Sequence, residues 1–217
     1  MGNILSLGLI GSWIAVIISL AILCRKIWPN KKELSRKIVH IGNGPVIPMA
    51  WFLGIPKDVA LTFSCLITIT LLINQQLRII PAIEDIDRKS FGTIGYGAAI
   101  TILLFYMWPD NAAAVSSGVL VMAFGDGLAG LIGSNINSYR WQILNQKKSL
   151  LGTSTMFIVS FLILLLINIY TGFSLSFSDI LIIALLATTL EQVGQYGLDN
   201  ILVPLVVAFS WVFFQGA

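Results

Sequence analysis

The chain has 217 residues, of which 57% are hydrophobic and only 11% are charged, and its mean hydropathy is +0.90. In soluble proteins roughly a quarter of the residues are charged. The composition therefore excludes a soluble globular protein and predicts an integral membrane protein. The formal net charge of +3 carries little information as a total, and we expect no nucleic-acid partner.

Apolar runs of about 20 residues, the length that crosses a bilayer as a helix, recur along the whole chain. They predict an all-α fold: a polytopic membrane helix bundle of about eight transmembrane helices, forming a single domain over residues 1–217. The spans are expected near residues 4–23, 38–54, 58–77, 92–108, 112–133, 151–170, 178–196 and 201–215. The first run lacks the basic segment and cleavage site of a signal peptide, so we expect it to be retained.

Basic residues are distributed unevenly over the connections between these spans. The segment 25–37 is rich in Lys and Arg, which predicts that it is cytoplasmic. With eight spans, every second connection lies on that side, and all of the 13 Lys and Arg residues except Lys57 fall there. The asymmetry predicts non-cytoplasmic termini and gathers the charged candidate residues at the cytoplasmic surface.

Prolines and glycines indicate how the helices pack. Pro45, Pro48 and Pro204 fall inside expected spans, where proline kinks or interrupts a helix. Glycines cluster in the second, fourth and fifth spans, and small residues let membrane helices approach closely. We therefore expect these three spans to be neighbours in the core.

Asp126 is an ionisable residue inside an apolar run, which makes it a functional-site hypothesis by default. Gly125, Gly127, Gly130 and Gly133 leave room around it for a ligand or another backbone. A carboxylate of this kind suits Mg²⁺, which is typically held by one or two carboxylates together with nucleotide phosphates. The structural alternative is an acid paired with a neighbouring helix.

A basic segment follows about twenty residues later. Lys147 and Lys148 offer positive charges, and Ser149 and Thr153 offer hydroxyls, all suited to phosphate oxygens, with Gly152 giving clearance. The plain alternative is that the two lysines only anchor the topology. Together with Asp126, the residues of this segment predict a nucleotide-handling site.

These two elements match neither a Walker loop nor a dinucleotide-binding G-x-G-x-x-G. They resemble the nucleotide-binding segment of the polyprenol and phytol kinase family, which includes dolichol kinase, phytol kinase and CTP-dependent diacylglycerol kinase. Its G-D-x-x-A-x-x-x-G element corresponds to residues 125–133, and its K-[ST]-x-x-G-[ST] element corresponds to residues 148–153.

The resemblance extends to an R-K-x-x-H element formed by Arg36, Lys37 and His40. His40 lies about one helical turn after Arg36, on the same helix face. We expect the two basic residues to bind substrate or phosphate and the histidine to have a catalytic role at the phosphate or the alcohol. The alternatives are topology anchors for the basic pair and a buried structural histidine.

A second basic pair, Arg88 and Lys89, precedes a glycine-rich stretch and resembles a basic segment of the same family. Both are expected to contact the triphosphate. The acids just before them, Glu84, Asp85 and Asp87, are more simply read as a solvated turn.

The C-terminal cluster resembles the family's E…D-N-x-x-V-P-L element through Glu191 and residues 199–205. Glu191 and Asp199 are candidates for the catalytic base, Asp199 also for metal binding, and Asn200 for substrate or phosphate contact. The residues alone do not divide these roles, and an ordinary loop with a helix N-cap is the alternative.

The resemblance implies transfer of the terminal phosphoryl group of CTP, or another nucleoside triphosphate, to phytol or a related isoprenoid alcohol in the bilayer, with Mg²⁺. Leu151 and Asn137 depart from the pattern of the dolichol members and favour a shorter alcohol. A cytidylyltransferase acting on a lipid phosphate and a small secondary transporter are the alternatives. A bacterial, thylakoid or chloroplast membrane is the expected location.

Overall fold

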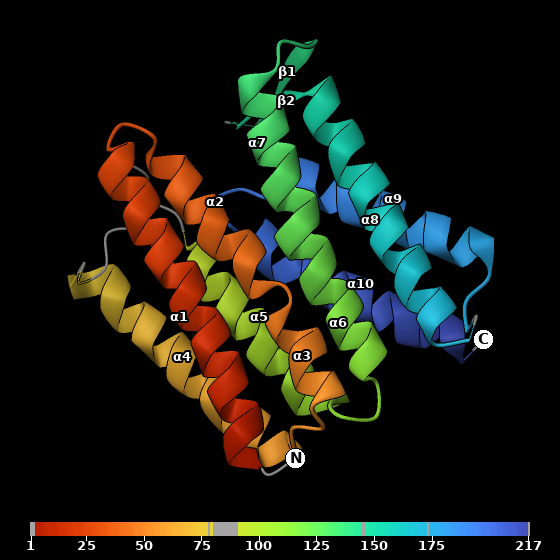
Figure 1. The fold of residues 1–217 in the computed structure, drawn as a ribbon. Helices are drawn as coiled ribbons and strands as arrows, with labels where there is room; N and C mark the ends of the chain where they lie inside the picture. Colours follow the sequence, from red (N-terminus) through yellow and green to blue (C-terminus); the bar gives the residue numbers. More distant parts are fainter. Residues whose placement is uncertain (1–2, 78, 80–90, 145, 173, 217) are drawn as a thin grey trace.

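The computed structural model describes residues 3–77, 79, 91–144, 146–172 and 174–216, and helices dominate it (Figure 1). The elements are, in chain order, α1 (Asn3–Ile27), α2 (Lys32–Asn43), α3 (Val46–Phe52), α4 (Lys57–Leu77), α5 (Gly92–Met107), α6 (Ala112–Leu120), the π-helix η1 (Val121–Asp126), α7 (Gly127–Asn135), β1 (Arg140–Ile143), β2 (Gln146–Ser149), α8 (Leu150–Tyr170), α9 (Phe177–Val193) and α10 (Asp199–Gln215).

Every expected span coincides with a helical unit, so the all-α fold class is confirmed. The span 38–54 comprises α2 and α3, and the span 112–133 comprises α6, η1 and α7. Within the described residues, 4 helical stretches are long and apolar enough to cross a membrane: Ile4–Ile27, Lys57–Leu77, Ala112–Asn135 and Leu150–Tyr170. The protein is a membrane helix bundle, and the count of eight spans stays a prediction.

The three prolines differ in their effect. The second span breaks between Asn43 and Val46, where Pro45 has no backbone N–H to continue the helix. Pro48 lies in the first turn of α3, where no such donor is needed. Helix α10 runs through Pro204 without ending. The expected interruption is therefore found at Pro45.

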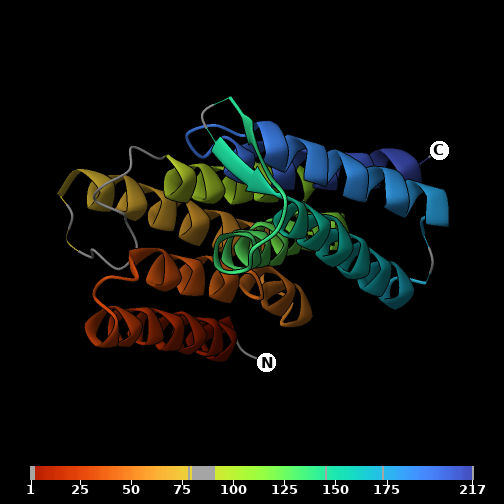
Figure 2. The same ribbon diagram turned by 90° about the horizontal axis from the view of Figure 1, so that it is seen from above.

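The unit formed by α6, η1 and α7 is the central helix of the bundle (Figure 2). Of its most apolar window 61% is buried, against 11% to 22% for the other three long stretches. It packs against α2, α3, α5, α8 and α10, so the glycine-rich spans are neighbours as expected. Its π-helical section ends at Asp126, and such sections are frequent at functional sites.

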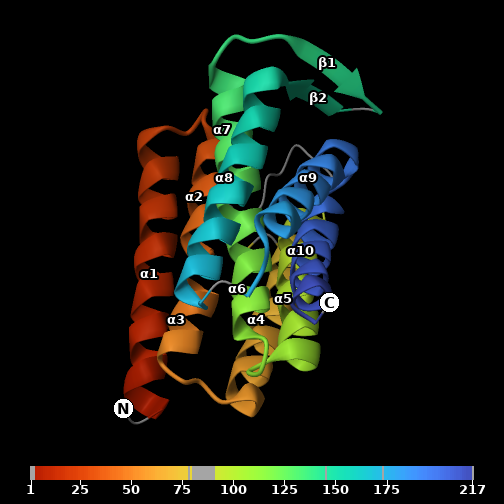
Figure 3. The same cartoon turned by 90° about the vertical axis from the view of Figure 1, so that its right-hand side faces the viewer.

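A β-hairpin lies at the basic segment that follows Asp126, where the sequence predicted no strand. Strands β1 and β2 pair antiparallel, with Arg140 opposite Ser149 and Ile143 opposite Gln146. Ser149 then caps α8, because its hydroxyl accepts a hydrogen bond from the Gly152 N–H at 3.2 Å. Figure 3 shows the hairpin at the end of the bundle where the α1–α2 and α9–α10 connections also lie.

Candidate functional site

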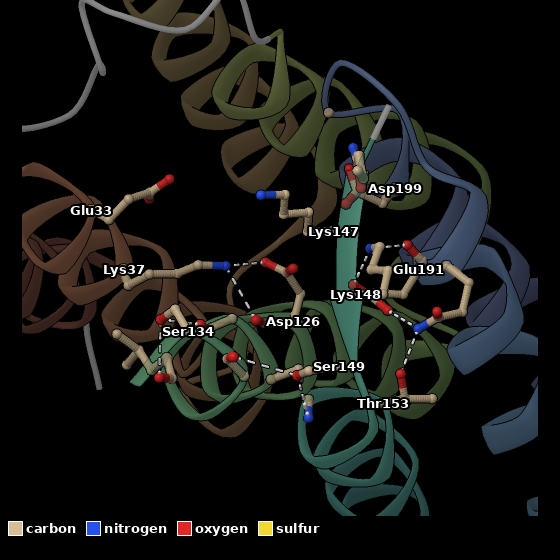
Figure 4. Close-up of a pocket in the computed structure, with 18 of the residues that line it drawn as sticks. Glu33, Lys37, Asp126, Ser134, Lys147, Lys148, Ser149, Thr153, Glu191 and Asp199 are labelled. Atoms are coloured by element: carbon tan, nitrogen blue, oxygen red, sulfur yellow. Dashed lines mark hydrogen bonds and ion pairs between the residues drawn. The ribbon is translucent and has the colours of Figure 1, made fainter. Parts of the chain in front are cut away.

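A cavity of about 490 Å³ opens beside the hairpin at this end of the bundle (Figure 4). It is lined by residues from α2, η1, α7, both strands, α8, α9 and α10. The predicted site residues that line it are Arg36, Lys37, Asp126, Gly133, Lys147, Lys148, Ser149, Gly152, Thr153, Glu191, Asp199 and Asn200. The buried aspartate, the twin lysines and the C-terminal acids thus share one cavity, and their roles in binding and catalysis stay predictions.

Asp126 is paired with Lys37 across the boundary between η1 and α2. Lys37 Nζ lies 2.6 Å from Asp126 Oδ2 and donates to the Asp126 carbonyl at 3.2 Å. The two side chains are only 15% and 10% exposed, respectively. Of the basic pair, Lys37 therefore neutralises the buried carboxylate, while Arg36 forms an ion pair with Glu33 at 2.9 Å on the rim.

His40 contacts Asp126 but does not line the cavity. Its Nε2 is 3.1 Å from the Met122 carbonyl and 3.4 Å from Asp126 Oδ2, and its ring lies 4.8 Å from the ring of Tyr96. Both oxygens are acceptors, so Nε2 carries a hydrogen. In this position His40 holds the Asp126 carboxylate and the backbone of η1 in place, and it does not contact a ligand in the cavity.

A second buried ion pair crosses from the hairpin to α9. Lys148 Nζ lies 2.5 Å from Glu191 Oε1 and donates to the Glu191 carbonyl at 2.6 Å. The other carboxylate oxygen accepts from Gln192 Nε2 at 2.8 Å, and the same nitrogen donates to Thr153 Oγ1 at 2.9 Å. Glu191 is thus held at both oxygens.

Two basic side chains of the hairpin and the carboxylate of Asp199 line the cavity without forming an ion pair among the described residues. Among the described residues, neither the side chain of Lys147 nor that of Arg140 has a hydrogen-bond or ion-pair partner. Asp199 Oδ1 accepts from the backbone and side chain of Asn200 at 3.1 Å. Asp199 precedes the span expected from residue 201, and burial, together with the negative charge of Asp126, raises its pKa to about 6.

The glycines around Asp126 serve mainly helix packing. A Cβ on Gly125 would lie 2.7 Å from Met156 Sδ, and one on Gly127 would meet Ile41 of α2. Neither glycine lines the cavity. A Cβ on Gly133 would lie 3.3 Å from Gly152 Cα, so this pair brings α7 against α8 where the cavity wall forms. Arg88 and Lys89 lie outside the described residues.

The described residues include carboxylates that could bind a divalent cation, but they do not form a complete coordination shell. No group of three or more His, Cys, Asp or Glu side chains close enough to hold a metal occurs in this part of the chain. Asp126 and Asp199 line the same cavity, and Mg²⁺ commonly completes its shell with phosphates and water. The donor set fits Mg²⁺ carried in with a triphosphate.

Sequence reasoning left several cavity-lining residues without a role, among them Gln192, Gln146 and Arg140. Gln192 contacts Glu191 and Thr153, Gln146 Nε2 donates to the Gly194 carbonyl at 2.7 Å, and Arg140 extends from β1. Gln192 directly follows the predicted acid Glu191, and this position was the only sign in the sequence that it belongs to the site. The roles of the other two depend on the hairpin, which was not predicted.

Comparison with known proteins identifies the family. No protein-family model and no solved structure matches the chain. It is 34% identical over 209 residues to the phytol kinase of Synechocystis sp., covering 93% of this chain and 88% of that protein. It is 28% identical to probable phytol kinase 2, chloroplastic, of Glycine max and 25% identical to phytol kinase 1, chloroplastic, of Arabidopsis thaliana, spanning 65% and 66% of their lengths. The chain belongs to the phytol kinase family.

Proposed function

We propose that this chain transfers the terminal phosphoryl group of CTP, or another nucleoside triphosphate, to phytol or a related isoprenoid alcohol. The observation that carries the proposal is the single polar cavity that joins Asp126, the hairpin lysines and the C-terminal acids at one end of a membrane bundle. The acceptor follows from the names of the relatives, and the donor follows from the motif resemblance.

The two substrates approach from different phases. The cavity is polar and lies at the helix ends, whereas helices beside it present apolar side chains outward, such as Ile158, Leu162 and Leu166 of α8. An isoprenoid tail would stay in lipid beside these surfaces while its hydroxyl enters the cavity. A triphosphate would come from the aqueous side.

The chemistry requires positioning and neutralisation of charge more than covalent catalysis. Lys147 and Lys148 would bind the phosphates, and Ser149 and Thr153 would donate hydrogen bonds to their oxygens. Asp126 would hold Mg²⁺, with Asp199 as a second candidate ligand, and the ion when bound neutralises charge on the triphosphate oxygens.

The proton of the alcohol needs an acceptor. Glu191 and Asp199 are the two carboxylates of the C-terminal cluster that line the cavity. Both oxygens of Glu191 already accept hydrogen bonds, whereas Asp199 Oδ2 has no donor among the described residues. Asp199 is therefore the better placed base, with Asp126 as the principal metal ligand.

The proposal includes a multi-pass topology with the cavity on the cytoplasmic face. It is supported by the basic connections, since all Lys and Arg residues except Lys57 are expected on that side. Labelling of Lys57→Cys and Lys147→Cys variants, made in a background without Cys24 and Cys65, from each side of sealed vesicles tests it. Labelling of both cysteines from the same side would contradict the topology.

The test of the function is an assay of the purified protein with labelled CTP, ATP, GTP and UTP. The acceptors are phytol, geranylgeraniol, farnesol, undecaprenol and diacylglycerol in lipid nanodiscs. We expect a prenyl monophosphate and a nucleoside diphosphate, abolished by a chelator and restored by Mg²⁺. Pyrophosphate release with a lipid phosphate would instead identify a cytidylyltransferase, and flux into proteoliposomes without triphosphate would identify a transporter.

The matched inactive variant is Asp126→Asn, which keeps the shape of the side chain and removes its charge. Turnover is expected to fall by about 100-fold or more, the scale on which lost electrostatic stabilisation acts, while expression and membrane insertion are retained. Because the substitution also takes the partner of buried Lys37 away, the melting temperature is measured beside turnover. Unchanged turnover would remove Asp126 from the mechanism.

A further inference from the structure

We propose that Gln192 is a positioning residue that fixes Thr153 as a hydrogen-bond donor toward the bound triphosphate and holds Glu191 in place. The inference rests on the proposed function and extends it to a residue outside the sequence motifs. Gln192 lines the cavity next to Glu191, and its one amide nitrogen reaches Glu191 Oε2 at 2.8 Å and Thr153 Oγ1 at 2.9 Å.

The neighbours of Gln192 determine which way its amide points. An ionised carboxylate only accepts hydrogen bonds, so the NH₂ group must face Glu191 Oε2. The opposite orientation would set the amide oxygen against a carboxylate oxygen. Gln192 Oε1 is consequently buried with no hydrogen-bond partner among the described residues. An orientation kept despite an unsatisfied acceptor indicates that contact with Glu191 dominates.

The amide orientation in turn determines the role of Thr153. Because Gln192 donates to Thr153 Oγ1, the hydroxyl uses a lone pair there and keeps its own hydrogen for another acceptor. No other hydrogen bond of the Thr153 hydroxyl occurs in the described part of the chain. Thr153 lines the cavity beside Lys148 and Ser149, so the available acceptor is an anionic oxygen of a ligand such as a phosphate.

Glu191 is fixed by the same amide. Lys148 binds Oε1 and Gln192 binds Oε2, so the carboxylate has one orientation. Lys148 comes from the hairpin and Gln192 from α9. If a triphosphate draws Lys148 away, Gln192 still holds the carboxylate.

The decisive comparison is between Gln192→Glu and Gln192→Met in the purified protein. Glutamate has nearly the shape of glutamine, but its ionised carboxylate cannot donate, so Thr153 would turn its hydrogen away from the ligand and Glu191 would be repelled. Methionine removes the amide without adding charge. We expect kcat/KM for the triphosphate to fall about 100-fold in Gln192→Glu and about 10-fold in Gln192→Met, the scale of one or two charged hydrogen bonds.

If Gln192 only filled space, the near-isosteric Gln192→Glu variant would lose less kcat/KM than Gln192→Met. That order would overturn the inference. Gln195→Glu and Gln195→Met are matched controls, since no hydrogen bond of this nearby side chain occurs among the described residues and it does not line the cavity. Both controls are expected to keep wild-type kcat/KM. Melting temperature checks the fold of each variant.

A double-mutant cycle tests the route through Thr153. Thr153→Val should raise the KM for triphosphate, and Gln192→Met added to it should raise KM no further if Gln192 acts on KM through the hydroxyl. Additive effects would contradict this route. The cycle also covers the case in which Gln192→Glu does not fold.

The role of Gln192 can be tested even if the protein does not phosphorylate an alcohol. Triphosphate-dependent thermal stabilisation should show the same order, strongest in wild type and weakest in Gln192→Glu, whatever the acceptor. Wild-type protein that turns over no alcohol would reject the function alone. Wild-type turnover with equally active Gln192 variants would reject the inference alone.

Discussion

Lys37 and Asp126, which are 89 residues apart in the chain, form an almost fully buried ion pair with 2.6 Å between Nζ and Oδ2. The pair joins α2 to the end of η1 and occupies one wall of the cavity. A divalent cation on Asp126 would compete with the ammonium for the carboxylate, and an ammonium displaced in this way would be free for a phosphate. The same lysine can thus stabilise the protein without ligand and bind the ligand when it arrives.

Loss of Lys37 should therefore destabilise the fold through Asp126. Lys37→Met leaves a buried carboxylate without its cation, and breaking such a pair costs about 3–5 kcal/mol. The double variant Lys37→Met with Asp126→Asn should recover most of the unfolding free energy but no activity. Denaturation in detergent micelles measures both. Equal stability of the single and double variants would show that the pair is not coupled.

Gly130 offers a way to disturb this pair without removing either charge. A Cβ at Gly130 would lie 2.9 Å from Lys37 Cε and 3.1 Å from its Nζ, so the flexible end of Lys37 must move away. Gly130→Ala is expected to keep the melting temperature, because alanine favours the helix by about 1 kcal/mol, while turnover falls about 10-fold. Gly11→Ala is the control, since nothing lies within 4 Å of its Cβ position. Equal activity of both variants would contradict the argument.

Substitutions of the two hairpin lysines should affect triphosphate binding and protein stability differently. Lys147 is exposed and has no partner in the described residues, so Lys147→Ala should leave the melting temperature unchanged. It should raise the KM for triphosphate about 10-fold, and less at high salt, because exposed charges are screened. Lys148→Met should lower stability as well, because it leaves Glu191 buried and unpaired. KM series at two salt concentrations and melting curves test both.

His40 should act through a hydrogen bond rather than through proton transfer. Its Nε2 contacts the Met122 carbonyl and Asp126 Oδ2, and an amide N–H can replace that donor. We expect His40→Gln to keep most of the turnover and His40→Ala to lose about 10-fold or more. Turnover and its pH profile are the measurements. An inactive glutamine variant with wild-type stability would restore the predicted catalytic role.

The long-range pattern of the site could be predicted, but its fine geometry could not. Apolar runs locate the helices, and charge asymmetry gathers the polar residues at one end. Arg36 and Lys37 are adjacent, however, and neighbours on a helix point about 100° apart. Only one of them can face Asp126, and the packing of α2 on η1 selects Lys37.

The hairpin and the π-helical section were missed for similar reasons. The strand Gln146–Ser149 has only polar residues and little β propensity. It is held by tertiary contacts, from Gln146 to Gly194 and from Lys148 to Glu191, which a local pattern does not contain. The π-helical turn has no periodic signal in the sequence either. Both features arise from packing rather than from local preference.

The hydroxyl of Ser149 has a consequence for how such chains can diverge. It caps α8 and lies 2.6 Å from where a side chain on Gly133 would begin. A methyl group at position 133 therefore collides with the cap, and relief requires a smaller residue at 149 and a weaker start to the helix. A larger residue at position 133 should therefore arise only together with a change at position 149, whereas position 149 can change alone between serine and threonine.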